Sequence, residues 1–306
     1  MLTRFSSRCI QSSSTLTSRL STSSTRPLSC GLRLFSSSSS SSSHEYQTNF
    51  RPQPPKELDL DMARGIQSAN RLILRHGVGH QRLKLLSQQS NLPLVVKWQH
   101  MMEIYLGAQL HILAALGFDA NEQGIMMYTQ KLSHFVGACD LDTQEEFRSM
   151  GRETWRTILA TAFDLDEKTV LPGGEEMSIV DARNTVHRVA TKLMEPRILE
   201  MVAQGCAKIP PQSDPQMEMG LKHQIIQDIV VNQVYLGGSP SLVEELGFGS
   251  GEKGYAIMQY VMSYHENDPL CTQYTSSAMM KLWQAAGLDL TQQAAAAALP
   301  MSSPRP

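Results

Sequence analysis

A sequence repeat with a spacing of 130 residues constrains the fold of this chain more than any other feature. Positions 105–124 and 235–254 share eight identities in twenty aligned positions, where unrelated sequences match at roughly one position in fifteen. The identities are Tyr105-Leu106-Gly107 with Tyr235-Leu236-Gly237, Leu116-Gly117-Phe118 with Leu246-Gly247-Phe248, Glu122 with Glu252, and Gly124 with Gly254. We therefore predict a tandem duplication, with one unit near residues 59–165 and the other near 177–290.

The spacing of apolar residues predicts that both units are built from helices. Within residues 121–139, one face of the expected helix carries the stripe Ile125, Tyr128, Leu132, Phe135 and Val136, as in an amphipathic helix. Thr143-Gln-Glu-Glu146 is interpreted as a capping box, and Ser239-Pro240 as an N-cap followed by a first-turn proline. No stretch alternates Val, Ile and Thr between turn residues, so the predicted fold class is all-α.

The shared Leu-Gly-Phe motif has a structural explanation. Gly117 and Gly247 are expected to take a positive φ at the end of a helix, which lets Phe118 and Phe248 fold back onto the last turn. Trp155 and Trp283 correspond when two residues are deleted, and each is expected to anchor the closing helix of its unit. Since everything that the units share serves folding, the duplicated unit is interpreted as a scaffold.

The N-terminal segment has the composition of a mitochondrial targeting sequence. Residues 1–44 contain five arginines, no acidic residue and a majority of Ser and Thr. Arg33 precedes the Phe35/Ser36 junction at the spacing that the matrix processing peptidase prefers, so we predict a cleaved, disordered presequence over residues 1–43. A Ser-rich tail and a plastid address are the alternatives. Residues 291–306 are predicted to be a disordered tail.

The remaining chain is acidic and has no sign of disulfide bonding. Without the five presequence arginines, 27 − 5 = 22 basic residues stand against 29 acidic ones, which disfavours a protein coated in nucleic acid, and no DNA partner is expected. Cys139, Cys206 and Cys271 form no paired motif, as expected for reduced thiols. No uncharged apolar stretch reaches about 18 residues, the length at which a segment becomes a candidate membrane-spanning helix. We expect the mature protein in the matrix or on the matrix face of the inner membrane.

The candidate chemical motifs do not satisfy the requirements of their sites. The glycines in His76-Gly-Val-Gly-His80 interrupt the helix that a metal site would need. The Gly-x-Gly-x-x-Gly pattern over 249–254 follows a predicted helix instead of a strand. The calcium-loop pattern from Asp164 to Glu175 has Thr169 where the turn glycine belongs. We therefore assign no catalytic, cofactor-binding or metal-binding residue, and a non-enzymatic role is favoured.

One segment differs in charge from the rest of the chain. Residues 62–102 contain no Asp or Glu. The residues taken as a candidate docking face are Arg64, Arg71, Arg75, Arg82 and Lys84. In this hypothesis the basic side chains are exposed, whereas Ile66, Leu72, Leu85 and Leu86 point inward. Such a face would bind an anionic membrane surface, RNA or an acidic protein; the alternative is an ordinary solvated helix face.

These observations favour a non-enzymatic mitochondrial scaffold. It would be an accessory or assembly subunit of a protein complex in the matrix or at the inner membrane. The first alternative is a protein that binds mitochondrial RNA or the mitochondrial ribosome, which the basic segment favours and the overall acidity disfavours. The second is a helical protein that binds a lipid or a quinone, which requires a cavity between the two units.

Overall fold

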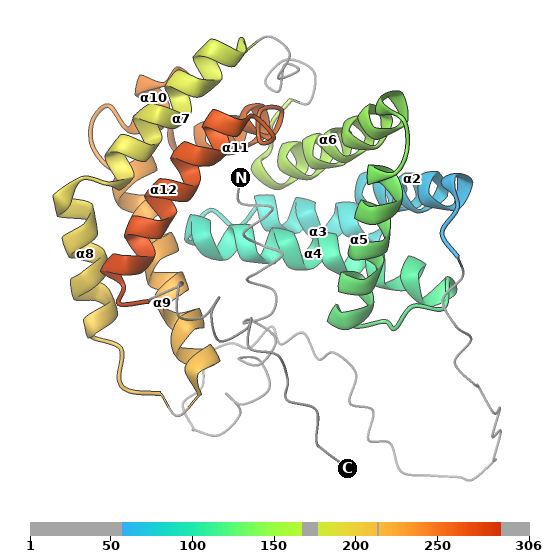
Figure 1. Ribbon diagram of the computed structural model, residues 1–306, viewed down its shortest axis with the longest axis horizontal. Helices are drawn as coiled ribbons and strands as arrows, with labels where there is room; N and C mark the ends of the chain where they lie inside the picture. Colours follow the sequence, from blue (N-terminus) through green and yellow to red (C-terminus); the bar gives the residue numbers. More distant parts are fainter. Residues whose placement is uncertain (1–56, 167–176, 213, 289–306) are drawn as a thin grey trace, which may run out of the picture.

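The computed structural model describes residues 57–166, 177–212 and 214–288, and these residues form a helical protein (Figure 1). Within these ranges there is no β-strand, which confirms the all-α prediction. The predicted presequence, residues 1–43, and the predicted tail, residues 291–306, lie outside the described residues.

The first half of the described chain contains long helices joined by short turns. They are α2 (Leu60–His76), α3 (Val78–Ser87), α4 (Leu94–Ala115), α5 (Glu122–Gly137) and α6 (Leu141–Phe163). Side-chain caps begin several of them: Asp59 accepts from the backbone N–H of Met62, and Asp140 from that of Thr143. The helix interpreted as starting with a Thr143 capping box therefore starts three residues earlier, because Asp140 supplies the cap.

The second half contains more helices, and two of them are short. They are α7 (Ile179–Leu193), α8 (Pro196–Ala207), α9 (Pro215–Ile229), the π-helical turn η2 (Val230–Tyr235), α10 (Leu242–Glu245), α11 (Gly251–Ser263) and α12 (Pro269–Ala285). The prediction that Ser239 caps a helix is wrong. Ser241 caps α10 in a capping box with Glu244, and the Ser239-Pro240 peptide bond is cis.

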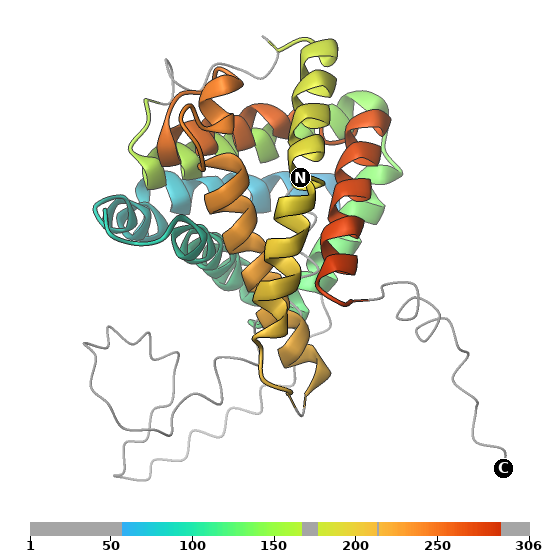
Figure 2. The same cartoon turned by 90° about the vertical axis from the view of Figure 1, so that its left-hand side faces the viewer.

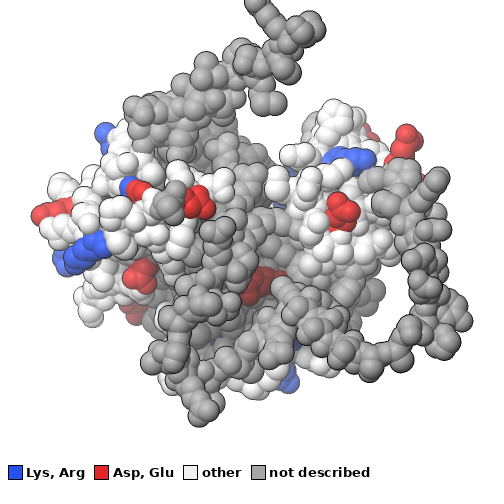
Figure 3. Space-filling view, turned by 90° about the horizontal axis from the view of Figure 1, so that it is seen from below, with Lys and Arg blue, Asp and Glu red and all other residues white. Residues whose placement is uncertain are grey.

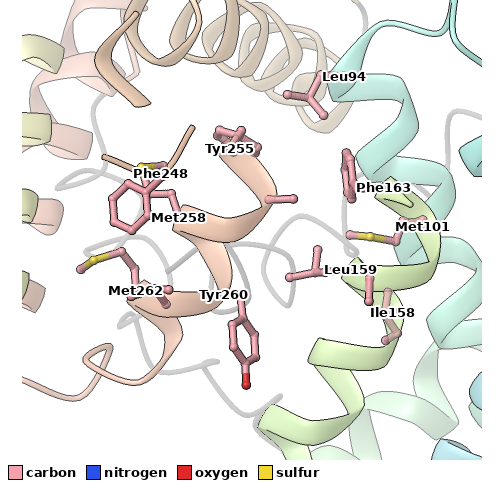
Figure 4. Packing of buried hydrophobic residues seen from close by; sticks show 14 of the residues in the cluster. Leu94, Met101, Ile158, Leu159, Phe163, Phe248, Tyr255, Met258, Tyr260 and Met262 are labelled. Carbon is pink, nitrogen blue, oxygen red and sulfur yellow. The ribbon is translucent and has the colours of Figure 1, made fainter. Parts of the chain in front are cut away.

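The two halves meet along α6 and α11. In Figure 1, α2 to α6 lie on one side, α7 to α10 and α12 on the other, and α11 runs beside α6. Viewed from the side in Figure 2, α12 packs along α7 and α8. The largest core cluster crosses this boundary: Figure 4 shows Met101, Leu159 and Phe163 of α4 and α6 facing the helix that carries Tyr255 and Tyr260. The halves therefore share a core.

The predicted helix stops are confirmed at both Leu-Gly-Phe motifs. Gly117 has φ of 81° and Gly247 has φ of 83°. The N–H of Phe118 donates to the carbonyl of Leu113 at 3.0 Å, and the N–H of Phe248 donates to that of Val243 at 3.0 Å, which is the Schellman pattern. Both phenylalanine side chains are buried.

The segments before these stops differ between the halves. Tyr105 lies in the middle of α4, which continues unbroken to Ala115, whereas Tyr235 ends η2 and a turn separates it from α10. Gly237 follows the π-helical turn at a point where a Cβ would lie 2.6 Å from the carbonyl oxygen of Gln233. The aligned sequences therefore share their helix stops and differ in the helices that lead to them.

The tryptophans occupy comparable places in the closing helices. Trp155 of α6 stacks on Tyr105 with ring centroids 5.7 Å apart, and Trp283 of α12 stacks on His223 of α9 at 5.3 Å. Burial lowers the pKa of His223 to about 4, so its imidazole is neutral at physiological pH. Each tryptophan of a closing helix thus packs against an aromatic ring of an earlier helix. None of the described helices is long and apolar enough to span a bilayer.

Candidate functional site

Arg64 and Arg71, two of the predicted docking residues, bind acidic residues of α6. The Arg64 guanidinium binds Glu146 in a two-pronged ion pair at 2.7 and 2.8 Å, and Arg71 binds Glu153. Both carboxylates belong to α6, so these arginines hold α2 against α6 instead of facing a partner. Two members of the predicted docking face are therefore reassigned, because acidic residues outside the acid-free segment reach them.

The other predicted docking residues lie on a surface that also exposes aliphatic side chains. On α2, Leu72 is followed at helical spacing by Arg75 and His76; on α3, Val78 is followed by Arg82 and Leu85. Leu72, Val78 and Leu85 are 60%, 60% and 61% exposed. The inward orientation predicted for Leu72 and Leu85 is therefore wrong, whereas Ile66 and Leu86 are buried as predicted. We define the α2–α3 surface as Leu72, Arg75, His76, Val78, Arg82, Lys84 and Leu85, all of them exposed.

The α2–α3 surface is basic. The only acidic residue in either helix is Asp61, in the first turn of α2 and away from this surface. Glu146 and Glu153 of α6 are bound to Arg64 and Arg71. On the face that Figure 3 shows, the described acidic and basic groups are interspersed with each other. Basic and aliphatic side chains together are suited to the boundary between water and lipid headgroups.

A groove of about 1030 Å³ forms a second candidate site. Its walls come from α4, α5 and α6, and it is closed at one side by the connection between α11 and α12 and by Met177. The lining residues are Met102, Tyr105, Leu106, Gln109, Ile125, Met126, Thr129, Gln130, Glu145, Arg148, Gly151, Arg152, Trp155, Met177 and residues 263–267. Since they come from several separate segments, no local motif in the sequence indicates this site.

One wall of the groove is aromatic. The rings of Tyr105 and Trp155 stack at an interplanar angle of 26°, and Trp98 stacks behind Trp155 at 6.3 Å. Burial raises the pKa of Tyr105, so its hydroxyl is protonated at physiological pH. This wall provides flat apolar surface with one neutral polar group.

The α6 side of the groove also carries charges, and they are paired. Glu145 binds both Arg148 and Arg152. The Arg152 guanidinium also lies 4.6 Å from the centroid of the Tyr264 ring, and the hydroxyls of Tyr264 and Tyr260 are 2.8 Å apart. Arg156 donates to the Tyr260 hydroxyl at 2.9 Å, which extends this network from the groove to the boundary between α6 and α11.

The described part of the chain offers little for metal or nucleophilic chemistry. No group of three potential metal ligands occurs there. Cys206 and Cys271 are buried, and burial raises the pKa of the Cys271 thiol to about 11 and also raises that of Cys206. Both thiols are therefore protonated at neutral pH and are poor nucleophiles.

No family model, no curated protein and no solved structure gives a significant match to this chain.

Proposed function

We propose that the chain is a non-enzymatic helical scaffold of mitochondria, an accessory subunit that docks on the anionic matrix face of the inner membrane through the α2–α3 surface. The observation that carries this proposal is the presence of exposed leucine and valine side chains among exposed basic ones on the same two helices. Neither kind of side chain alone would distinguish a docking surface from a solvated helix face.

Each kind of side chain has a defined contribution at a membrane. A Lys or Arg near an anionic leaflet contributes about 1 kcal/mol of attraction. An aliphatic side chain that enters the headgroup boundary gains about 0.8 kcal/mol for each buried CH₂ group. The α2–α3 surface has three such aliphatic residues, Leu72, Val78 and Leu85, and the exposed basic residues Arg82 and Lys84. Reversible binding to the bilayer surface follows, without a membrane-spanning helix.

RNA remains the second candidate partner, because phosphates also bind Lys and Arg. Apart from the imidazole of His76, the α2–α3 surface has no aromatic side chain on which an unpaired base could stack. Exposed aliphatic side chains also gain nothing from contact with phosphates. These two features favour lipid over RNA.

We also propose that the two halves arose by tandem duplication. Support comes from the similar φ values of Gly117 and Gly247, 81° and 83°, and from the matching Schellman bonds of Phe118 and Phe248. A two-pronged ion pair joins the first and last helices of each half, Arg64 with Glu146 and Arg183 with Asp268. A duplication followed by divergence of the segment between Tyr235 and α10 accounts for these likenesses.

We expect the full-length chain to be imported into mitochondria and processed between Ser36 and Glu45. The reason is the acid-free, arginine-containing composition of residues 1–44, which suits import driven by the membrane potential. The measurement is import of the radiolabelled chain into isolated mitochondria, followed by N-terminal sequencing of the protected form. A chain that stays outside, or a protected form that still begins upstream of Arg33, would contradict the mitochondrial address.

Membrane docking is tested with the double variant Arg82→Glu/Lys84→Glu. The wild type should float with vesicles of phosphatidylcholine and cardiolipin and should release as salt is raised, because salt screens exposed charges. Loss of two attractive charges should weaken binding by about 2 kcal/mol, or roughly thirtyfold, and the introduced repulsion should weaken it further. The control is Arg197→Glu/Lys208→Glu, an equal charge change at exposed residues around α8.

The control variant should bind the vesicles like the wild type, and both variants should melt like it, since exposed charges contribute little to stability. Equal binding by the Arg82/Lys84 variant would show that α2–α3 is a solvated face. If that variant loses RNA during purification from mitochondria and keeps its vesicle binding, RNA replaces lipid as the partner.

A further inference from the structure

The groove between α4, α5, α6 and the α11–α12 connection has features that suit a small molecule. Its volume of about 1030 Å³ is at the upper end of the range for small-molecule sites. Such a space accommodates a ring together with an attached chain. The groove lies apart from the α2–α3 surface, since its lining includes no residue of α2 or α3.

The charges around the groove indicate that its ligand is uncharged. The lining contains two arginines, and both are bound to Glu145. Glu266 supplies a second carboxylate among the lining residues, so the groove is lined by two arginine and two glutamate side chains. An anionic ligand would have to take Arg148 or Arg152 away from Glu145, and a cationic one would face both guanidinium groups. The remaining polar groups are amides, hydroxyls and the imidazole of His265, and all of these can bind neutral oxygen atoms.

The apolar walls indicate the shape of the ligand. Tyr105 and Trp155 present stacked rings, and aromatic rings favour other flat unsaturated rings. Met102, Met126 and Met177 line the same space. Methionine side chains are flexible and polarisable, so they adapt to a chain or a ring edge. We infer that this groove is a binding site for a neutral amphipathic molecule with a flat, oxygen-bearing ring and an apolar chain, of the quinone type.

Gly151 allows the inference to be tested by filling the groove. It lines the groove in the middle of α6, and a Cβ added there would meet no atom within 4 Å. An added Cβ therefore needs no shift of the backbone, and a larger side chain at this lining position is expected to occupy groove volume. Gly65 of α2 also has open space around an added Cβ, and it is exposed and far from the groove in sequence. The matched variants are Gly151→Phe and Gly65→Phe, with Gly151→Leu as a second filling variant.

The probe is a benzoquinone that carries a decyl chain, and the signal is tryptophan fluorescence. Trp155 lines the groove and Trp98 stacks on it, so a bound quinone should quench both. We expect saturable quenching in the wild type and in Gly65→Phe. In Gly151→Phe and Gly151→Leu the apparent Kd should rise at least about tenfold, which corresponds to about 1.4 kcal/mol. Circular dichroism establishes that the variants keep their helices.

Decanoate and decanol, added as competitors, identify the chemical class of the ligand. We expect both to displace the quinone only weakly, because decanoate is charged and decanol has no ring. Displacement by decanoate at concentrations similar to that of the quinone would overturn the neutral class, and equal displacement by decanol would overturn the requirement for a ring. Quenching that does not saturate, or that folded Gly151 variants leave unchanged, would overturn the site itself. Purified protein suffices for these measurements, so their outcome is independent of membrane docking.

Discussion

Replacing Gly254 or Gly124 by alanine should destabilise the protein by about 3 kcal/mol or more, a large cost for one added methyl group. Each glycine lies in the first turns of a helix that follows a Leu-Gly-Phe stop. An added Cβ would lie 2.2 Å from the carbonyl oxygen of Gly249 in the first case and 1.9 Å from that of Asp119 in the second. Because both obstacles are backbone atoms, the backbone itself must move. The expected destabilisation therefore lies at the upper end of the usual range for overpacking.

Gly65→Ala provides the matched control for this prediction. Gly65 is also inside a helix, but a Cβ there meets no atom within 4 Å. Alanine should therefore stabilise the protein by up to about 1 kcal/mol through its better helix propensity. The measurement is urea unfolding followed by circular dichroism. If Gly254→Ala is as stable as the wild type, the tight turn at the start of α11 is absent from the folded protein.

These glycines illustrate what the sequence could and could not predict. The repeat identified the Gly124/Gly254 pair and the Leu-Gly-Phe stops, since a positive φ and a helix end depend on local residues. It did not explain why Gly124 and Gly254 are shared, because the clash with a carbonyl five residues earlier depends on the path of the turn between helices. Local signals thus predicted where helices end, and three-dimensional packing was needed to explain the glycines inside them.

The prediction of the docking face was limited in the same way, because the pairing of charges also depends on three-dimensional packing. Five basic residues of the acid-free segment 62–102 are interpreted from sequence as one face, and Lys97 lies in the same segment. Arg64, Arg71 and Lys97 instead bind Glu146, Glu153 and Glu252, which are 82, 82 and 155 residues away. Leu72 and Leu85 were expected inside because apolar residues usually are, yet helix periodicity alone does not say which apolar residues find a partner helix. The groove was beyond prediction because its walls are separate segments.

Removing the carboxylate of Glu252 should destabilise the protein by about 3 kcal/mol, whereas removing the amine of its partner Lys97 should cost much less. The Lys97 Nζ lies 2.9 Å from a Glu252 carboxylate oxygen and 4.8 Å from the centroid of the Phe163 ring. The Lys97 side chain is 6% exposed and that of Glu252 is 35% exposed. Glu252→Ala therefore leaves a buried ammonium without its counter-ion, which costs about 3–5 kcal/mol when both members are buried.

The reverse change leaves a carboxylate that water can reach. Lys97→Met keeps most of the side-chain volume and places a sulfur near Phe163, a favourable contact. We expect a cost below about 1.5 kcal/mol, as for a volume-conserving replacement. The double variant Lys97→Met/Glu252→Ala should then be more stable than Glu252→Ala alone, because it contains no unpaired buried charge.

Arg188 and Glu245 provide a comparison pair at the surface. Their side chains are 49% and 36% exposed and their charged atoms lie 2.9 Å apart, so Glu245→Ala should cost below about 1 kcal/mol. Urea unfolding of the five proteins, wild type included, measures the asymmetry. Equal costs for Glu252→Ala and Lys97→Met, or a double variant no more stable than Glu252→Ala, would mean that water reaches Lys97. The contact between α4 and α11 would then have to be held by its apolar residues alone, since Lys97 and Glu252 join the two halves at the same boundary as the shared core.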